Sequence, residues 1–401
     1  MSRITVIGLD GSPLNAEAES LLEEAVLVVG GARHLEVLGV QGERAVVLKG
    51  DLSEALDRIG EVGGPVVVLA SGDPGFFGIV RLLGERFGAE NLRVLPSVSS
   101  VALAFARAGI SWDDAITVSA HGRDPRRAVN ICRAHPKVAV LTSREFGPAE
   151  LARELEGWRR TFFIAERLGE PDERTFRGGA AEVVGEEWRD PNVVLVVDEA
   201  RAVGGRGWIS GSFESPGRWA LPADDFEHRS AMITKPETRS LVLARLGPGP
   251  GDLVWDVGAG SGSVAIECAL HGAAAVAIER DPESCARIRK NAARHGACVR
   301  VFESEAPGAL RGLPEPDAVF IGGSGGNFEE IVKLCAVRAR RSVVVSLITL
   351  ERVVPAGEIL ADWGLEVETT LLQASRVKGV ADSLHRLAAE TPVFVVSGRK
   401  Q

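Results

Sequence analysis

The stretch "WDVGAGSGSVAIE", residues 255–267, decides the fold of the second half of the chain. An apolar run that ends at Val257 is followed by a glycine-rich turn and then by a second apolar run, which is the order of a strand, a loop and a helix. Gly258, Gly260 and Gly262 let a ligand approach the backbone, and the amides at the start of the helix favour its negative end. The stretch therefore predicts a ligand-binding turn in an α/β domain.

The spacing of this loop differs from that of a dinucleotide fingerprint. The pattern G-x-G-x-x-G needs a third glycine where Ser263 stands. Asp256, two residues before the first glycine, would repel a pyrophosphate and would suit a ligand that carries an ammonium group. Contacts to ribose and adenine are common to NAD and S-adenosylmethionine, whereas a tail with both an ammonium and a carboxylate belongs to the second. The loop therefore favours S-adenosylmethionine and leaves NAD as an alternative.

Three more features follow the ends of the next predicted strands. Glu279 closes the strand in "AIERD", about 20 residues after the loop, where a carboxylate can accept both hydroxyls of a ribose. Glu303 and Glu305 flank a strand end in "FESEAPGAL", where a carboxylate can bind the amine of adenine, and "FIGGSGG" (320–326) adds glycines beside the ligand. Each feature alone could serve a turn or a cap. Because the carboxyl ends of parallel strands line one crevice, the four together predict one binding site.

The second half as a whole alternates strands and helices, which predicts a doubly wound α/β domain with about seven strands. Helices are expected at 236–247, 263–272 and 281–296, the last with an aspartate cap, a proline in its first turn and a glycine at its end. The expected strands are 252–258, 274–280, 299–306, 316–323, 341–349, 365–376 and 392–399.

The first half also alternates strands and helices. Since 401 residues exceed one typical core, we expect separate domains at 1–200 and 230–401, joined by a linker at 201–229 that is rich in Gly, Ser and Pro. The strands expected in the first half are 4–9, 26–30, 45–50, 65–73, 137–143, 161–169 and 192–198, and the helices are 15–25, 51–62, 97–109 and 147–158.

Four small-residue turns mark a second candidate site in the first half. "ASGDPGFFG" (70–78) follows a strand and exposes backbone, and "VIGLDGS" (6–12) forms a second glycine turn. "LPSVSS" (95–100) adds hydroxyl groups, and "SAHGRD" (119–124) adds His121 and Arg123. A lone histidine is more often structural than catalytic, so His121 is a weak candidate.

Composition narrows the classes of function. A net charge of −9 and a pI of about 5.5 argue against nucleic acid, and the basic stretches 126–133 and 376–379 are interpreted as solvated charge. The five cysteines form no C-x-x-C pair, so we expect buried thiols in a reducing compartment and no metal. The chain shows no signal-peptide pattern and no apolar run long enough to span a membrane, so a cytoplasmic location is expected.

The motifs of the second half resemble the CbiT type of class I precorrin methyltransferase over nearly all of residues 230–399. The resemblance rests on "TKPETR", "WDVGAGSGSVAIE", "AIERDPES", "ESEAPGAL", "DAVFIGGSGG" and "PVFVVSGR". This chain has "ESEAP" where the family often shows "EGDAP", which places Glu305 at the position of a shorter acid. The resemblance and the residue patterns together give these candidate S-adenosylmethionine contacts: Thr234, Asp256, Gly258, Ala259, Gly260, Ser261, Gly262, Glu279, Glu305, Ala306 and Gly322.

The motifs of the first half resemble the CbiE branch of the tetrapyrrole methylase family over about residues 3–198. The resemblance rests on "VIGLDGS", "VVGGARHLE", "LASGDPGFFG", "PSVSSVALAFARAG", "VSAHGRD" and "AERLGEPDER". It implies two α/β subdomains with S-adenosylmethionine in the cleft between them, although the first turn reads "GLDGS" and not the usual G-x-G-x-G. The candidate cofactor contacts here are Gly8, Gly72, Asp73, Pro74, Ser99 and Ser100.

The two resemblances together imply two methyl transfers to a precorrin, at carbons 5 and 15, with loss of the acetate carboxyl at carbon 12 as carbon dioxide, in biosynthesis of the corrin ring of cobalamin. The sulfonium methyl is already activated, so positioning can supply most of the catalysis and no nucleophilic triad is expected. Arginines should bind the substrate carboxylates, with Arg123, Arg167 and Arg376 as candidates. The catalytic residues are unknown, with His121, Arg123 and Arg376 as weak candidates, and a homo-oligomer is expected by analogy.

Three alternatives stay open at this point. The first half could be a degenerate scaffold beside one active methyltransferase. The second half could be a nucleic-acid methyltransferase, although "GGSGG" stands where such enzymes carry an aromatic and proline-rich motif, and the acidic balance opposes it. An NAD-dependent dehydrogenase is the third alternative, and it would bind NADH in place of S-adenosylhomocysteine.

Overall fold

The computed structural model describes residues 4–48, 52–202, 210, 218–229, 233–323, 325–381 and 384–400. Contacts between residues divide the chain into two compact units that interleave along the sequence. The first unit comprises Met1–Arg123, Ala139–Arg153 and Arg160–Val197, and the second comprises Asp124–Val138, Glu154–Arg159 and Asp198–Gln401. No helix among the described residues has the length and apolar character needed to cross a membrane.

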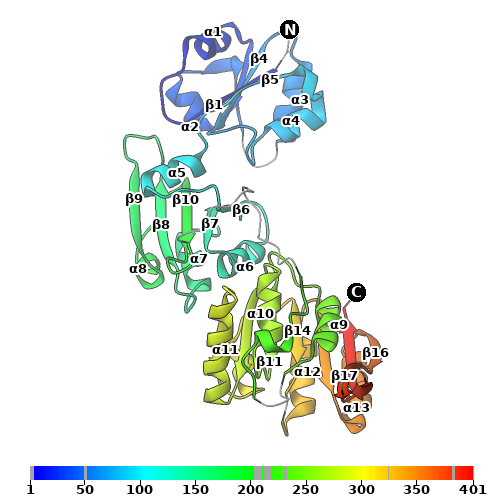
Figure 1. Ribbon diagram of the computed structural model, residues 1–401. Helices are drawn as coiled ribbons and strands as arrows, with labels where there is room; N and C mark the ends of the chain where they lie inside the picture. The colour runs from blue at the N-terminus through cyan, green and yellow to red at the C-terminus, as the bar shows by residue number, and fades with distance from the viewer. Residues whose placement is uncertain are drawn as a thin grey trace. The chain divides into compact units, whose positions relative to one another are not determined.

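The first unit begins with a five-stranded sheet of order β3-β2-β4-β1-β5, whose strands all run parallel (Figure 1). Apolar β-branched residues fill both faces of this sheet, as a parallel sheet covered by helices requires. Ile59 and Leu83 pack against one face, and Ala18 and Leu35 pack against the other. The strands are β1 (Ile4–Leu9), β2 (Leu27–Gly30), β3 (Ala45–Val47), β4 (Val66–Ser71) and β5 (Leu92–Leu95), and the helices are α1 (Ala16–Glu24), α2 (Ala32–Val37), α3 (Ser53–Glu61) and α4 (Val80–Phe87).

A second sheet, of order β6-β7-β10-β8-β9, follows in the chain, so the first half holds the two α/β subdomains that the resemblance implied. Helix α5 buries Val101 and Phe105 against Ala165 and Leu195 of this sheet. The sequence pattern did not indicate β5, β6 and β9, because these strands are short or alternate apolar with polar residues. The elements are α5 (Ser100–Ala108), β6 (Ile116–Ser119), β7 (Lys137–Leu141), α7 (Pro148–Glu154), β8 (Thr161–Glu166), β9 (Arg174–Gly179), α8 (Ala180–Val184) and β10 (Asn192–Val197).

The second unit contains the predicted seven-stranded sheet, with order β13-β12-β11-β14-β15-β19-β16. Five neighbouring strands run parallel, and β19 runs antiparallel to β15 and β16. Trp255 is fully buried in a hydrophobic core cluster on one face of this sheet. The elements are α9 (Pro236–Leu246), β11 (Leu253–Val257), α10 (Ser263–Leu270), β12 (Ala274–Glu279), α11 (Pro282–Arg294), β13 (Val299–Glu303), β14 (Ala318–Ile321), α12 (Phe328–Arg338), β15 (Ser342–Leu347), α13 (Val353–Asp362), β16 (Glu366–Leu372) and β19 (Val393–Arg399).

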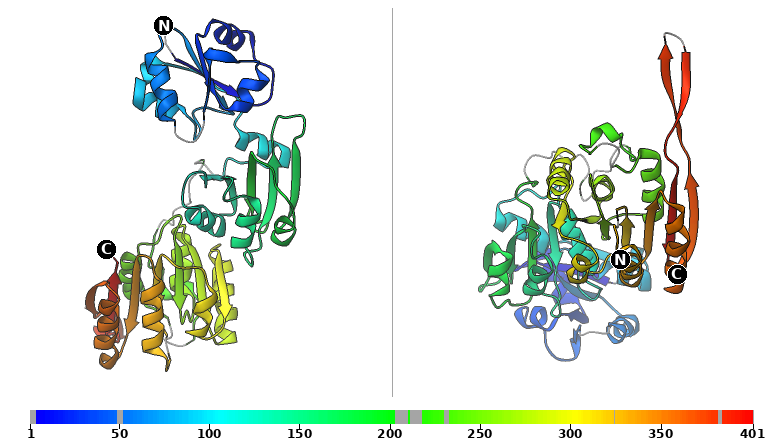
Figure 2. Two further views of the ribbon diagram at one scale, coloured as in Figure 1. Left: turned by 180° about the vertical axis from the view of Figure 1, so that it is seen from behind. Right: turned by 90° about the horizontal axis from the view of Figure 1, so that it is seen from below.

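One predicted strand of the second unit was wrong in its extent. The strand expected at 365–376 ends at Leu372, and the chain then forms an antiparallel hairpin of β17 (Ser375–Ala381) and β18 (Leu384–Ala389). Figure 2 shows this hairpin projecting from the sheet of its unit. Its pattern mixes exposed apolar and charged residues, so periodicity alone gave no sign of a separate element.

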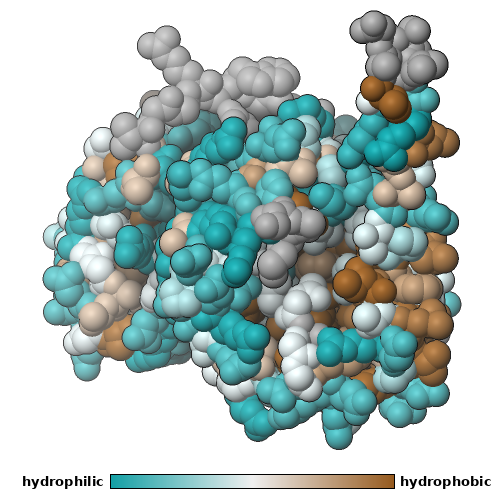
Figure 3. Space-filling model, turned by 60° about the horizontal axis from the view of Figure 1, so that its bottom comes forward, coloured by the Kyte–Doolittle hydropathy of each residue, from teal (hydrophilic) through white to brown (hydrophobic). Residues whose placement is uncertain are grey.

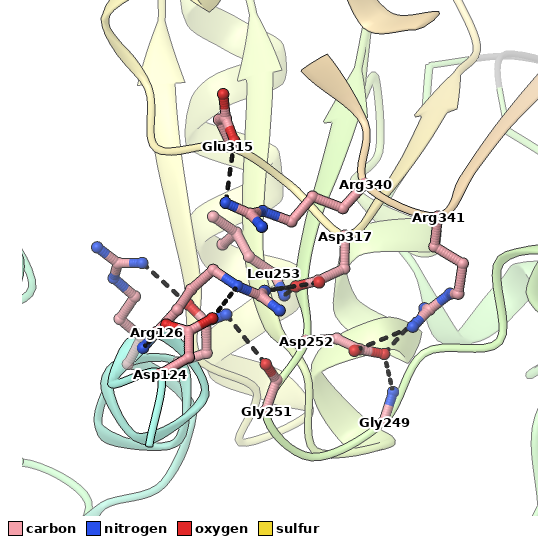
Figure 4. A network of polar contacts seen from close by, with 12 residues as sticks. Asp124, Arg126, Gly249, Gly251, Asp252, Leu253, Glu315, Asp317, Arg340 and Arg341 are labelled. Carbon is pink, nitrogen blue, oxygen red and sulfur yellow. Dashed lines mark hydrogen bonds and ion pairs between the residues drawn. The ribbon is translucent and has the colours of Figure 1, made fainter. Parts of the chain in front are cut away.

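The basic stretch 126–133 was interpreted as solvated charge, and the structure contradicts this. It forms most of α6 (Arg126–Ala134), which packs in the second unit and leaves the side chain of Arg133 buried. Nη1 of Arg126 donates to both carboxylate oxygens of Asp317, at 2.6 and 2.7 Å (Figure 4). Nδ2 of Asn130 donates to the carbonyl of Gly251 at 3.0 Å. Arg126 and Arg133, two of the three arginines of this stretch, therefore have carboxylate partners within the protein.

The segment expected to be a linker is partly packed. Its residues 203–209 and 211–217 lie outside the described part of the chain, but 218–229 lie against the second unit. Leu221 and Phe226 are buried in one cluster with Ile266 of α10. The apolar residues in this Gly- and Pro-rich stretch were the signal that it carries its own contacts. We call residues 218–229 the strap.

Two candidate ligand-binding sites

The glycine loop of the second unit has the geometry that its sequence predicts. Gly258, Gly260 and Gly262 have φ angles of 71°, 56° and 74°, a region that favours glycine. A Cβ atom at Gly258 would lie 1.9 Å from the carbonyl oxygen of Gly323. The glycines after β14, Gly322 and Gly323, therefore lie directly against the loop. Two of the four sequence features predicted to bind one ligand, the loop after β11 and the glycines after β14, are thus in contact.

Asp256 lies behind this loop and has a partner that the sequence did not suggest. Its side chain is 1% exposed, and Oδ2 accepts a hydrogen bond of 3.0 Å from the amide of Ala265 in the first turn of α10. Oδ1 is buried with no hydrogen-bond partner among the described residues. Burial raises the pKa of Asp256 to about 7, assisted by the nearby charge of Glu279. The structure thus gives the carboxylate a role at the helix start, and the predicted contact with an ammonium group stays a prediction.

Glu279 lies at the loop, as expected for a ribose-binding carboxylate. Its Oε2 accepts from the amide of Gly260 at 2.9 Å, and its Oε1 accepts from the amides of Arg280 and Asp281 at 2.9 and 3.0 Å. Glu305 is brought near by an ion pair of 2.8 Å between its Oε1 and Nη1 of Arg280. The ends of β12 and β13 therefore present two carboxylates beside one glycine loop.

A buried polar network holds the other predicted contacts. Asn291 of α11 donates to the carbonyl of Ser261 at 2.9 Å, and it exchanges hydrogen bonds with the backbone of Glu227 in the strap. Arg239 of α9 donates to the carbonyl of Thr234 at 2.5 Å and pairs with the buried carboxylate of Glu267. Nothing in the sequence indicated a role for Asn291, Arg239 and Glu267, since each lies within an ordinary amphipathic helix pattern.

The remaining candidate residues of the second unit are partly buried or are paired with other side chains of the protein. Ala306 is half-buried against the main core, and Ala259 packs beside α11 and its sheet. Arg376 forms ion pairs with Glu237 at 2.6 Å and with Glu390 at 3.4 Å. The charge of Arg376 is thus balanced within the protein, which weakens it as a substrate-binding residue.

In the first unit, the predicted turns after β1, β4 and β5 meet at one point. A Cβ atom at Gly8 would lie 2.3 Å from the carbonyl of Gly72 and 3.0 Å from Pro74. A Cβ atom at Gly72 would lie 3.1 Å from the amide nitrogen of Ser100. The carboxyl ends of three neighbouring strands therefore form one crevice, which is where open α/β sheets bind ligands.

Two candidates of the first unit have structural roles of their own. Ser99 is the N-cap of α5, and its hydroxyl accepts a hydrogen bond from the amide of Ala102 at 3.1 Å. The Oδ1 atom of Asp73 accepts from the amide of Gly75 at 2.8 Å and thereby closes the turn. As cofactor contacts, both residues stay predictions.

A cavity of about 1600 Å³ opens beside this crevice, and both subdomains of the first unit line it. Gly72, Ser100, His121, Arg123 and Arg167 line this cavity, so the structure brings together candidates from distant parts of the chain. Two arginines and one histidine of the lining were not predicted from the sequence, and they come from α2 and α4: Arg33, His34 and Arg81.

Acidic residues balance some of the arginines in the cavity. Arg33 forms an ion pair with Glu170, and Arg167 pairs with Glu170 and, at 3.0 Å, with Asp172. No ion pair with Arg81 or Arg123 occurs among the described residues. Arg81 and Arg123 are therefore the cavity arginines available to an anionic ligand.

Two family descriptions match the chain, one in each half. Residues 7–184 match the family described as Tetrapyrrole (Corrin/Porphyrin) Methylases, and residues 224–397 match the family described as Precorrin methyltransferase domain.

Relatives of both full and half length share substantial identity with the chain. A precorrin-6Y C(5,15)-methyltransferase (decarboxylating) of Sinorhizobium sp. is 40% identical over 361 residues, 84% of this chain and 82% of the relative. A cobalt-precorrin-7 C(5)-methyltransferase of Salmonella typhimurium is 33% identical and covers 49% of this chain and 99% of its own length. A probable cobalt-precorrin-6B C(15)-methyltransferase (decarboxylating) of Methanothermobacter thermautotrophicus is 32% identical over 44% of this chain and 94% of its own length.

Proposed function

The chain belongs to the family of decarboxylating precorrin-6Y C(5,15)-methyltransferases, and from this membership we propose that its two halves catalyse different methyl transfers to one precorrin. The tetrapyrrole methylase half would methylate carbon 5. The second half would methylate carbon 15 and release the acetate carboxyl at carbon 12 as carbon dioxide. The division is supported by half-length relatives, which carry a C(5) or a C(15) decarboxylating activity in their descriptions.

The observation that carries this proposal is the presence of a separate strand-end crevice in each unit. S-adenosylmethionine would supply an activated methyl group on a sulfonium. In the second unit, Glu279 would bind the ribose hydroxyls, and the Gly258–Gly262 loop would lie along the amino-acid tail. The open backbone of the loop and the carboxylate at its edge fit such a ligand. In the first unit, the junction of Gly8, Gly72 and Ser100 would hold the second molecule.

The cavity of the first unit fits a large substrate with several carboxylates. Its volume of about 1600 Å³ exceeds what a cofactor alone requires. Arg81 and Arg123, from opposite subdomains, would pair with acetate or propionate groups at its rim. Methyl transfer would then depend mainly on holding the acceptor carbon and the methyl group in line.

Calorimetric titration with S-adenosylhomocysteine tests the two-site proposal. We expect two molecules bound per chain. Gly258→Ala should remove one site, since its Cβ atom collides with Gly323, and Gly8→Ala should remove the other, since its Cβ atom collides with Gly72. Gly312→Ala and Gly63→Ala are matched controls without a neighbour within 4 Å, and both should keep two sites.

Other stoichiometries would select one of the alternatives. One site that Gly258→Ala abolishes and Gly8→Ala leaves intact would mean that the first half is a degenerate scaffold. Binding of NADH in place of S-adenosylhomocysteine would overturn the interpretation of the glycine loop. With precorrin as acceptor, a singly methylated product would show that only one half is active.

We also propose that the chain forms a homo-oligomer through the hairpin β17–β18. A two-stranded hairpin alone is only marginally stable in water. Val377 and Leu387 are directly opposite each other in the ladder and are 66% and 69% exposed. Figure 3 shows hydrophobic side chains on the projecting hairpin. Light scattering should show that Val377→Asp lowers the molar mass to that of one chain. An unchanged mass would contradict the proposal that the hairpin forms the interface between chains.

A cytoplasmic location stays a prediction of the sequence.

A further inference from the structure

We propose that His34, acting through the hydroxyl of Ser71, is the general base of the first unit and removes the proton that methylation of the substrate releases. This inference rests on the proposed function of that unit. His34 lies on α2 just after β2, and Ser71 is the last residue of β4. Because β2 and β4 are parallel neighbours, their carboxyl ends place both side chains at the same edge of the sheet.

The contact between the two side chains lies at the cavity wall. Oγ of Ser71 is 3.2 Å from Nε2 of His34, and both residues line the cavity. Ser71 is exposed, whereas His34 is half-buried behind it. The next residue, Gly72, belongs to the junction proposed to hold the cofactor. The hydroxyl therefore lies between the methyl donor's crevice and the space available to the substrate.

The neighbouring arginine sets the tautomer of the imidazole. Nη2 of Arg33 lies 3.3 Å from Nε2 of His34. A guanidinium can only donate, so Nε2 must carry the lone pair and Nδ1 the proton. Nδ1 is buried and has no hydrogen-bond partner among the described residues. Nε2 is thus the basic atom of the ring, and the Ser71 hydroxyl connects it to the cavity.

The charges around His34 keep the imidazole neutral at neutral pH. Burial lowers its pKa, and the Arg33 charge on the same helix lowers it further. Glu170, from the second subdomain, opposes this shift, but Glu170 is itself paired with Arg33 and Arg167. A neutral ring can accept a proton, which an imidazolium cannot.

The proton transfer balances the methylation. When a macrocycle carbon bonds to the methyl group, the electron pair of the broken carbon–sulfur bond stays on sulfur, and the macrocycle gains one positive charge. Loss of one proton from the macrocycle restores neutrality. The Ser71 oxygen takes that proton while its own hydroxyl proton moves to Nε2 of His34. The imidazolium beside Arg33 then releases its proton to water.

His121 is the rival base in the same cavity. It is exposed, and its ring makes no hydrogen bond or ion pair among the described residues, so nothing sets its tautomer. His34, by contrast, has one defined basic atom and one defined connection to the cavity. The two histidines can be separated by their effect on the pH profile.

The test is the pH dependence of single-turnover methylation at carbon 5 by the full chain. The wild type should lose rate on the acid side, below the ordinary histidine pKa. His34→Gln should slow the reaction by about 100-fold or more and abolish that acid limb. Ser71→Ala should resemble it, and Ser71→Thr should recover most of the rate. His121→Gln should keep the acid limb.

Binding and folding measurements separate catalysis from structure. Each variant should bind S-adenosylhomocysteine within about threefold of the wild type, and NMR of labelled histidine in the free protein should show His34 protonated at Nδ1. An acid limb that persists in His34→Gln, or disappears in His121→Gln, overturns the proposal. Equal losses of rate and of S-adenosylhomocysteine affinity would also overturn it. A wild type that does not methylate carbon 5 would instead refute the proposed function.

Discussion

At the scale of single residues, Asp256 combines complete burial with an incomplete set of hydrogen bonds. Its pKa rises from 3.8 to about 7 on folding, so the folded state binds a proton more tightly than the unfolded chain. The stabilising effect of that proton is fully present below pH 4 and is lost as pH rises through 7. At pH 8 the buried carboxylate is charged, and only one of its oxygens has a partner.

The first prediction concerns the variant Asp256→Asn. An amide keeps an acceptor for the Ala265 N–H group but cannot ionise. The second unit of the wild type should therefore lose stability between pH 5 and pH 8 relative to the variant. Urea denaturation followed by hydrogen exchange in β11 measures the difference at both pH values. Parallel pH curves for the two proteins would show that Asp256 does not titrate in this range.

Some properties of single residues could be predicted from the sequence, and others could not. The glycines of the loop after β11 were identified correctly as a tight turn, since only glycine adopts such backbone angles readily. The direction of the Asp256 side chain was not predictable, because it depends on how α10 begins above the strand. His34 was missed although it lies in the quoted motif "VVGGARHLE", because its partner Ser71 is 37 residues away.

At the scale of elements, one network of polar contacts next to the glycine loop connects the strap with the helices α9, α10 and α11. The guanidinium of Arg239 is fully buried against Glu267 and also donates to the carbonyls of Leu221 and Thr234. The carboxylate of Glu267 accepts the amides of Ala220 and Leu221. A single buried ion pair therefore fixes the strap and the segment that carries Thr234.

The second prediction concerns Glu267→Gln. Removing one partner of a buried ion pair leaves an uncompensated charge, which costs about 3–5 kcal/mol. We expect loss of most of the stability of the second unit and of its S-adenosylhomocysteine site, measured by thermal unfolding and calorimetry. Glu330→Gln breaks the exposed pair with Arg311 and should change stability by less than about 1 kcal/mol. Equal effects of the two variants would contradict the role given to the buried pair.

Elements with strong periodicity were predictable, and those defined by distant contacts were not. The helix at Pro282–Arg294 begins and ends where its cap, proline and glycine indicated. The apolar residues of the strap follow no regular period, and Leu221 and Phe226 pack in one cluster with Ile266 of α10 and Ala292 of α11. The hairpin after β16 was missed because its strands face solvent and carry no buried stripe.

At the scale of the whole molecule, the two units are not two consecutive stretches of sequence. Helix α6 and residues 154–159 belong to the sequence of the methylase half but pack into the second unit. Ala134 and Trp158 join the core that contains Trp255. Asp317 joins these parts, since it binds Arg126 and also accepts the amide of Leu253 at the start of β11 at 2.8 Å.

This arrangement leads to the last prediction, that the second unit is stabilised by the first half of the chain. Arg126→Met removes two hydrogen bonds to a nearly buried carboxylate and should lower the stability of the second unit by about 2 kcal/mol. Asp317→Ala should cost more, because the Leu253 amide also loses its acceptor. Since the two side chains act on each other, the double variant should cost less than the sum of the single variants.

Glu315→Gln is the matched control, because it breaks the exposed pair with Arg340 in the same network. Thermal unfolding of the full chain, with hydrogen exchange assigned to β11 and β14, would locate the loss. If Arg126→Met destabilised the second unit no more than Glu315→Gln, helix α6 would be an appended helix without effect on the fold. A loss confined to the variants of Arg126 and Asp317 would mean that the second unit depends on residues from before position 200, and that a fragment beginning at 230 lacks part of its own core.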